Sequence, residues 1–241
     1  MLPFFRRIRK SLLESGRLSK YLLYAMGEIL LVVIGILIAL QVNNWNMERA
    51  SQTEEQRIVA DLQDEIAKAM LSRTEILHGY RANQATLGSA LDKLFSGRII
   101  PLTVDECQGV SFSHGIRWDP RSISTLEELV ATGKLALLRD AHLRERLITF
   151  RNVAASNTRR LDQIFLELNV LVDAFPLLIQ RNWKAELQDS EFICNTRKMQ
   201  SDRSFLARLQ SNHGRLRAPI NAAAVELEHL EEISQILSRY E

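Results

Sequence analysis

The longest apolar run of the chain lies near its N-terminus. From Tyr21 to Leu40 the sequence reads YLLYAMGEILLVVIGILIAL, twenty residues with one charge. As a helix rising 1.5 Å per residue, this run would be about 30 Å long, the thickness of the hydrocarbon core of a bilayer. Tyr21 and Tyr24 lie at one end and Trp45 just beyond the other, where interfacial aromatic side chains are enriched. The pattern predicts a transmembrane helix over residues 19–44.

Apolar residues recur at spacings of three and four in three later stretches. The stripes comprise Val59, Leu62, Ile66, Ala69, Ile76, Tyr80, Leu87 and Leu94; then Leu143, Leu147, Phe150, Ala154, Asn157, Leu161, Ile164, Leu168, Leu171 and Phe175; then Leu206, Leu209, His213, Leu216, Ile220, Ala223, Leu227, Leu230, Ser234 and Leu237. A repeat near 3.5 residues keeps one stripe facing a neighbouring helix. Arg73 and Asn83 interrupt the first stripe. No stretch of comparable length alternates with period two, so we expect no sheet.

Helix-breaking residues set the expected boundaries between these stretches. A shorter helix over Ser122–Ala131 is expected to end at Gly133 as a left-handed C-cap, and Asp140 can cap the helix that follows. Pro176 ends or kinks the second long helix, and Pro219 either kinks the third or divides it into two pieces.

Helices that each carry one apolar stripe must bury those stripes against one another. We therefore predict an all-α protein, with an N-terminal transmembrane helix followed by an elongated antiparallel helical bundle. The expected divisions are a basic amphipathic cytoplasmic tail (1–18), the transmembrane helix (19–44) and an extracytoplasmic bundle domain (45–241). A parallel coiled-coil dimer through residues 50–95 is an alternative, which the interruptions in the first stripe disfavour. Whether the first long helix continues from the membrane span stays open.

Charge is distributed unevenly around the apolar run. Residues 1–20 carry six Lys or Arg against Glu14 alone, a net charge of +5, so the other 221 residues sum to −3 within the total of +2. The positive-inside rule places the N-terminus in the cytoplasm and the remaining domain outside it. A basic head on a mildly acidic body indicates anionic lipid as the partner rather than nucleic acid. The run ends in QVNNWN without an A-x-A-like cleavage site, which predicts an uncleaved anchor.

Two segments resemble a known family. Residues 20–46, KYLLYAMGEILLVVIGILIALQVNNWN, are similar to the opening of an uncharacterised family of bacterial single-span membrane proteins, with its Y-x-x-G-E-I-x-L-V-x-x-G-I-x-I-A-L-Q-x-N-N-W-N run. Residues 125–138, TLEELVATGKLALL, resemble that family's T-x-x-E-L-x-x-x-G-K-L-x-L-I element. Met26 stands where Ile is more usual. The resemblance implies the same architecture and a place in the bacterial inner (cytoplasmic) membrane with a periplasmic domain. It implies no activity, because the family is a domain of unknown function.

Glu28 is the sharpest single feature of the apolar run. A carboxylate at this depth costs on the order of 2–3 kcal/mol on insertion scales and is usually protonated, paired or facing protein. Gly35 and Ala39 share its helical face and form a small-residue pair of the kind that packs helices in lipid. We expect Glu28, Gly35 and Ala39 to form a helix–helix contact in the membrane, with a second copy or with a partner protein. The alternatives are a hydrated carboxylate near the cytoplasmic interface and a proton- or ion-conducting role.

The two cysteines, Cys107 and Cys194, lie 87 positions apart without C-x-x-C or zinc-like spacing. In an oxidising compartment they could form a disulfide, and two separate thiols are the alternative. No histidine shows an obvious tie to either, so no catalytic cysteine is predicted.

Two Glu-x-x-His units, Glu75/His78 and Glu226/His229, have the spacing that di-iron sites in bundles use. Both are expected beside the apolar stripes on a solvated surface, so we interpret them as coincidence. No nucleotide-binding loop, nucleophile elbow or metalloprotease motif occurs. The sequence predicts no catalytic, cofactor-binding or metal-binding residues and no cofactor.

These observations favour a non-enzymatic interaction or scaffold protein anchored in the membrane. One alternative is a periplasmic domain that senses a small ligand and signals through a partner. The other is a metal-dependent enzyme.

Overall fold

The computed structural model describes residues 18–115, 118, 121–184 and 189–240, and the chain divides into two compact units, Met1–Gln56 and Arg57–Glu241. The elements in chain order are α2 (Leu18–Phe95), α3 (Val104–Ser111), α4 (Ser124–Ala131), η1 (Lys134–Leu137), α5 (Ala141–Leu166), α6 (Leu171–Ala174), β1 (Ile179–Lys184), β2 (Asp189–Cys194), α7 (Thr196–Ser201), α8 (Arg203–Arg215), α9 (Arg217–Leu237) and η2 (Ser238–Tyr240). The predicted all-α class is confirmed. The tail predicted for residues 1–18 lies outside the described residues, except for Leu18.

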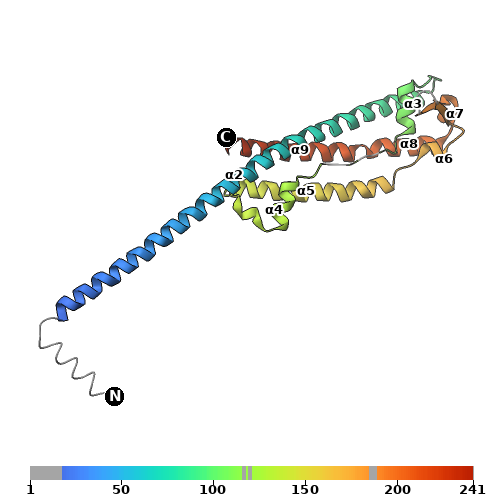
Figure 1. Ribbon diagram of the computed structural model, residues 1–241. Coiled ribbons are helices and arrows are strands. Elements are labelled where there is room, and N and C mark those ends of the chain that lie inside the picture. Colours follow the sequence, from blue (N-terminus) through green and yellow to red (C-terminus); the bar gives the residue numbers. More distant parts are fainter. Residues whose placement is uncertain (1–17, 116–117, 119–120, 185–188, 241) are drawn as a thin grey trace, which may run out of the picture. The chain divides into compact units, whose positions relative to one another are not determined.

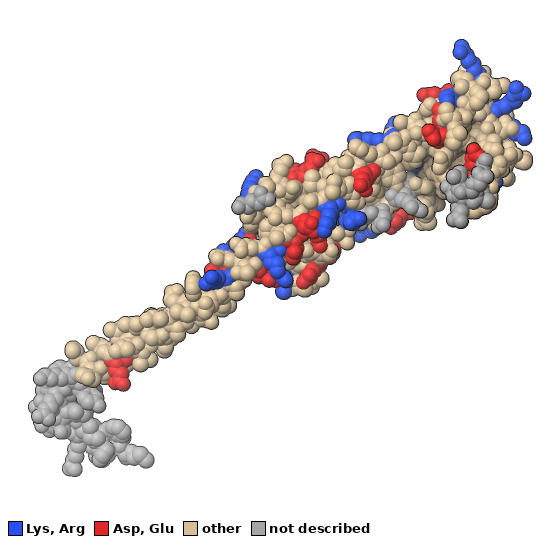
Figure 2. Space-filling model, turned by 45° about the horizontal axis from the view of Figure 1, so that its top comes forward, with Lys and Arg blue, Asp and Glu red and all other residues tan. Residues whose placement is uncertain are grey.

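The first unit contains the N-terminal part of α2. Its apolar segment is long and apolar enough to cross a membrane, and its side chains are exposed rather than buried. Figure 2 shows this segment almost free of charged side chains, in line with a sequence in which Glu28 is the one charged residue between Tyr21 and Met47. Helix α2 has no break between Leu18 and Phe95, so the apolar segment and the first predicted stripe belong to one helix.

The second unit is a three-helix bundle made of α2 from Arg57 onward, α5, and the pair α8–α9 (Figure 1). At one end of the bundle, Leu62 of α2 shares a core cluster with Leu147 of α5 and Ile233 of α9. At the other end, Leu87 of α2 packs in one cluster with Leu209 of α8. Helices α2 and α5 therefore run in the same direction and α8–α9 runs opposite to both, so the predicted antiparallel packing holds for α8–α9 but not between α2 and α5. Helix α3 packs in the cluster at one end of the bundle and α4 in the cluster at the other.

The predicted stripe of α2 forms the side of that helix that faces the bundle core. Its apolar members are buried from Val59 to Leu94, apart from the half-buried Ile76, and they pack against α5, α8 and α9 of the same chain. The stripe over residues 57–95 is thus covered within one chain, which removes the reason to pair two copies through it.

Most local boundary signals act as the sequence predicts. Gly133 has a φ of +69° immediately after the end of α4 at Thr132, in the left-handed region that glycine adopts without a Cβ penalty. The Asp140 side chain caps α5 by accepting hydrogen bonds from the backbone N–H groups of His142 (2.8 Å) and Leu143 (3.1 Å). The third long stripe is divided into α8 and α9, and Pro219 lies in the first turn of α9, where no N–H is needed for an intrahelical bond.

The predicted second helix is too long. It was expected to reach Phe175, but α5 ends at Leu166, and only the short α6 follows. The buried Asn212 of α8 holds the intervening backbone, because it accepts a hydrogen bond from the Asn169 N–H (3.0 Å) and donates one to the Asn169 carbonyl (2.8 Å). The Asn212 side chain thus takes up the backbone hydrogen-bonding groups of Asn169 that would otherwise continue the helix.

The expectation of no sheet is also wrong, since β1 and β2 pair as an antiparallel hairpin in which Ile179 lies opposite Cys194. Ile179 and Phe192 are buried, whereas Trp183 and Ile193 are exposed. Each strand is six residues long and buries few side chains, so the period-two signal is too short to stand out.

Candidate functional sites

The three residues proposed for a membrane contact lie on one exposed face of α2. At 100° per residue, Gly35 and Ala39 are each within about 20° of Glu28 around the helix axis. All three are exposed, and a Cβ added at Gly35 would meet no atom within 4 Å. The face is therefore open to a neighbouring helix, and Glu28 makes no ion pair with a described residue.

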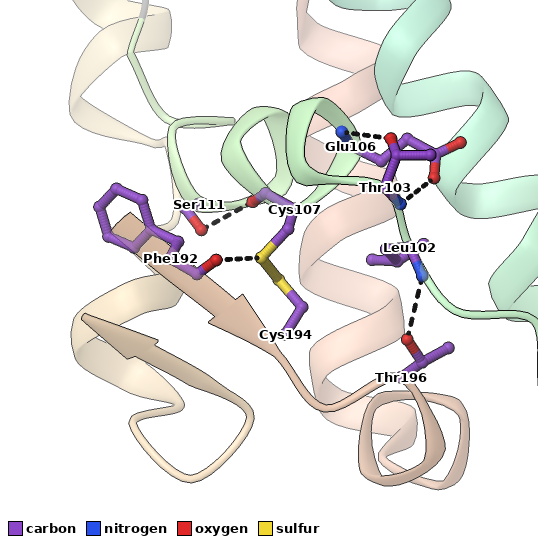
Figure 3. The surroundings of a disulfide bond; sticks show 8 residues. All are labelled: Leu102, Thr103, Glu106, Cys107, Ser111, Phe192, Cys194 and Thr196. Atoms are coloured by element: carbon purple, nitrogen blue, oxygen red, sulfur yellow. Dashed lines mark hydrogen bonds between the residues drawn. A yellow bond between two sulfur atoms is a disulfide. The ribbon is translucent and has the colours of Figure 1, made fainter. Parts of the chain in front are cut away.

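The two cysteines lie together in the second unit. Cys107 of α3 and Cys194 at the end of β2 form a disulfide, with their Cα atoms 5.7 Å apart (Figure 3). Beside it, the rings of Phe112 and Phe192 meet edge to face at 5.0 Å between centroids. The disulfide links the β-hairpin to α3. Helix α3 is too short to show an apolar stripe in the sequence.

A buried carboxylate organises the start of α3 next to this disulfide. Thr103 and Glu106 form a capping box, in which the Thr103 N–H donates to Glu106 Oε2 (2.8 Å) and the Glu106 N–H donates to Thr103 Oγ1 (3.2 Å). Glu106 also accepts hydrogen bonds from Lys93 Nζ (2.6 Å) and Ser89 Oγ (2.7 Å) of α2. Burial by itself would raise the pKa of Glu106, but these hydrogen bonds and the charge of Lys93 outweigh it and lower the pKa from 4.5 to about 2.

This lowered pKa predicts a defined loss of stability in acid. Because Glu106 binds its proton more weakly when folded, its contribution is complete above about pH 4.5 and is lost as the pH falls towards 2. At pH 7, Glu106→Gln should reduce the free energy of unfolding by about 2 kcal/mol. This is less than the pKa shift of Glu106 alone would imply, because Lys93 is partly solvated. Thermal unfolding of the full chain in detergent at pH 7 and pH 3 measures the difference, which should shrink at pH 3.

The matched control for that prediction is Asp92→Asn, which removes an exposed carboxylate next to Lys93 on α2. A gap between Glu106→Gln and the native chain that stays constant from pH 7 to pH 3 would contradict the role given to the ionised carboxylate.

One polar side chain from each long helix meets in the centre of the bundle. Arg73 Nε of α2 donates to Glu226 Oε2 of α9 (2.7 Å), and Asn157 Nδ2 of α5 donates to Glu226 Oε1 (2.9 Å). Arg73 is 1% exposed and Glu226 0%. Arg73 Nη2 also reaches the Arg121 carbonyl (3.4 Å). We call Arg73, Asn157 and Glu226 the polar layer.

The polar layer overturns one sequence-based placement. Glu226 was expected beside the stripe on a solvated surface, but it points into the bundle and pairs with Arg73. Its partner in the Glu-x-x-His unit, His229, instead lies 3.9 Å from Glu232, while Glu75 and His78 are exposed. Within the described part of the chain, no three His, Cys, Asp or Glu side chains gather in a way that could hold a metal ion.

An open pocket adjoins the polar layer. Its lining is contributed by Arg73, by the segment that enters α4 and by the middle of α5. At its rim Arg151 holds Glu127 with two nitrogens, Nε and Nη2, at 2.9 Å each. These hydrogen bonds with Glu127 raise the pKa of the Arg151 guanidinium above its ordinary value.

The fold defines a class of protein: an all-α chain with one N-terminal helix that could cross a membrane and a disulfide-bonded helical bundle. More specifically, the chain belongs to a family of unknown function (DUF6090), whose model matches residues 28–193. No curated protein and no solved structure matches the chain.

Proposed function

We propose that this chain is a single-pass protein of the bacterial inner membrane that acts without catalysis as an anchored interaction or scaffold protein. In this proposal the apolar part of α2 spans the bilayer, the N-terminus lies in the cytoplasm and the bundle lies in the periplasm. The excess of Lys and Arg before the span supports that orientation.

The disulfide is a second and independent support for a periplasmic bundle. Structural disulfides form and persist in oxidising compartments and are rare in the bacterial cytosol. Both cysteines of the chain are in this bond. A bundle on the cytoplasmic side would keep them as thiols.

The observation that carries the interaction role is the exposed face of α2 at Glu28, Gly35 and Ala39. In hydrocarbon, a carboxylate gains from a hydrogen-bonding neighbour, and small residues allow two helix backbones to approach closely. These two features coincide on one face of the helix. We therefore expect a second transmembrane helix to pack there, from another copy of this chain or from a different membrane protein.

Site-specific photo-crosslinking in native membranes tests this contact. A photoreactive residue in place of Ala39 should give a discrete protein adduct, and mass spectrometry of the adduct identifies a second copy or another protein. The matched control is the same residue in place of Leu37, which lies about 180° from Glu28 on the helix and should give lipid adducts only. Equal yields at both positions, or no protein adduct at Ala39, would rule out the proposed face.

A further inference from the structure

The pocket beside the polar layer has the dimensions of a small-molecule site. Its volume is about 840 Å³, within the range of roughly 300–1,000 Å³ in which small ligands are bound. It is bounded by Arg73 on α2, by Trp118 and residues 121–127 around the start of α4, and by residues 150–159 of α5. It lies wholly within the second unit.

The charge of this pocket is strongly positive. Four arginines line it, Arg73, Arg121, Arg151 and Arg159, against one carboxylate, Glu127. Glu127 is occupied by Arg151, and the charge of Arg73 is matched by Glu226 behind it. Arg121 and Arg159 make no ion pair with a described residue, so the pocket keeps an excess of two positive charges.

Two acidic residues near Arg121 line a different pocket. Arg121 also borders a smaller pocket with Asp64 and Glu65 of α2. Glu65 accepts a hydrogen bond from the Thr125 N–H (3.0 Å) at the start of α4, which directs this carboxylate to the helix terminus. Arg159, on α5, lines the larger pocket and not this smaller one, so a substitution at Arg159 distinguishes the two pockets.

Two buried N–H donors at the pocket have no acceptor among the described residues. Arg73 Nη1 and Trp118 Nε1 are both inaccessible atoms without a hydrogen-bond partner. Arg73 is itself 1% exposed, so this unused donor is held by a side chain that the Glu226 contact fixes in place. Buried donors are nearly always satisfied in folded proteins, and an unsatisfied charged donor is costly. An anion that displaced the atoms covering these two donors would supply the acceptor.

Apolar side chains also line the pocket. Ile123, Leu126 and Phe150 line it, and they are members of the buried core that are 1% to 4% exposed. The apolar lining that is exposed belongs to Ala155 and to the half-buried Ala154 and Trp118, which a bare inorganic ion would leave in contact with water and an apolar or aromatic group would cover. A lining that is part cationic and part apolar favours a ligand that carries both an anionic group and an apolar group.

We propose that this pocket binds a small organic anion, in which a carboxylate or phosphate group faces Arg73, Arg121 and Arg159 and an apolar or aromatic group lies against Trp118. Planar guanidinium groups suit both anions because each can form two parallel hydrogen bonds with them. This site is separate from the membrane contact proposed above, so either can fail without the other.

Trp118 provides a direct reporter. In the full chain with Trp45→Phe and Trp183→Phe, both exposed positions, Trp118 is the remaining tryptophan. Its fluorescence is followed in detergent during titration with phenyl phosphate and with phenylacetate, which separates the phosphate and carboxylate forms of the ligand. Inorganic phosphate and the uncharged 2-phenylethanol are the comparison probes.

We expect saturable binding of at least one aromatic anion, with both comparison probes about tenfold weaker or more. Arg159→Gln and Arg121→Gln should each weaken binding about tenfold, and the matched control Arg160→Gln, on α5 but outside the pocket, should not. Arg73 is left unchanged because it holds the core together. The proposal is overturned if neither anion saturates, if 2-phenylethanol or inorganic phosphate binds equally well, or if Arg160→Gln weakens binding as much as Arg159→Gln does.

Discussion

Glu226→Ala is expected to lower the free energy of unfolding by about 3–5 kcal/mol, the largest effect of any single substitution outside the apolar core. The substitution leaves the Arg73 guanidinium charged at a site that is 1% exposed, without the carboxylate 2.7 Å from its Nε. Asn157 also loses its acceptor. For a chain of this size the melting temperature should fall by roughly 10 °C, measured by circular dichroism of the full chain in detergent.

Two further variants separate the loss of a partner from the loss of a charge. Arg73→Met combined with Glu226→Leu removes both ions and fills the site with apolar atoms, so it should unfold near the native temperature or above it. Glu127→Ala breaks the pair with Arg151, whose side chains are 39% and 50% exposed, and should cost at most about 1 kcal/mol. If Glu226→Ala costs no more than Glu127→Ala, the polar layer contributes little to stability.

The sequence predicts the three long helices well because each must bury one stripe, and a stripe repeats many times along a helix. In this pattern Arg73 is only an interruption of the first stripe and Asn157 only a member of the second. Their contact with Glu226 depends on how α2, α5 and α9 are aligned along their axes. Arg73 and Glu226 are 153 positions apart, and no local pattern states that register. A cue was present: Arg73 and Asn157 each fall on a predicted stripe, as buried partners would.

Elements fixed by tertiary contacts were harder to predict. The end of α5 depends on Asn212, and the hairpin depends on α3 and a disulfide, so neither follows from periodicity. Helix α3 itself was predictable, because Thr103-Val-Asp-Glu106 spells a capping box. The pocket lined by Arg73, Arg121, Arg151 and Arg159 could not be predicted from sequence, since these arginines come from two helices and one connecting segment that meet only in the fold.

Replacing both cysteines by serine should cost about 4 kcal/mol of stability. The bond between Cys107 and Cys194 spans 87 positions and encloses α4, α5 and the hairpin. In the chain-entropy description, a closed loop of this length removes much of the freedom of the unfolded chain, and opening it returns that freedom. Urea unfolding of the full chain in detergent should show a lower midpoint for the Cys107→Ser/Cys194→Ser variant than for the oxidised native chain.

Reductant supplies the internal control, because it should lower the midpoint of the native chain towards that of the variant and leave the variant unchanged. Thiol labelling ties the bond to its compartment: after rapid acid quenching of cells and denaturation, the native chain should react with a maleimide only if it has first been reduced. Equal midpoints for the oxidised chain and the variant would mean that the bond does not constrain the unfolded chain as argued. Labelling without prior reduction would place these cysteines in a reducing compartment, and the periplasmic position of the bundle would be wrong with it.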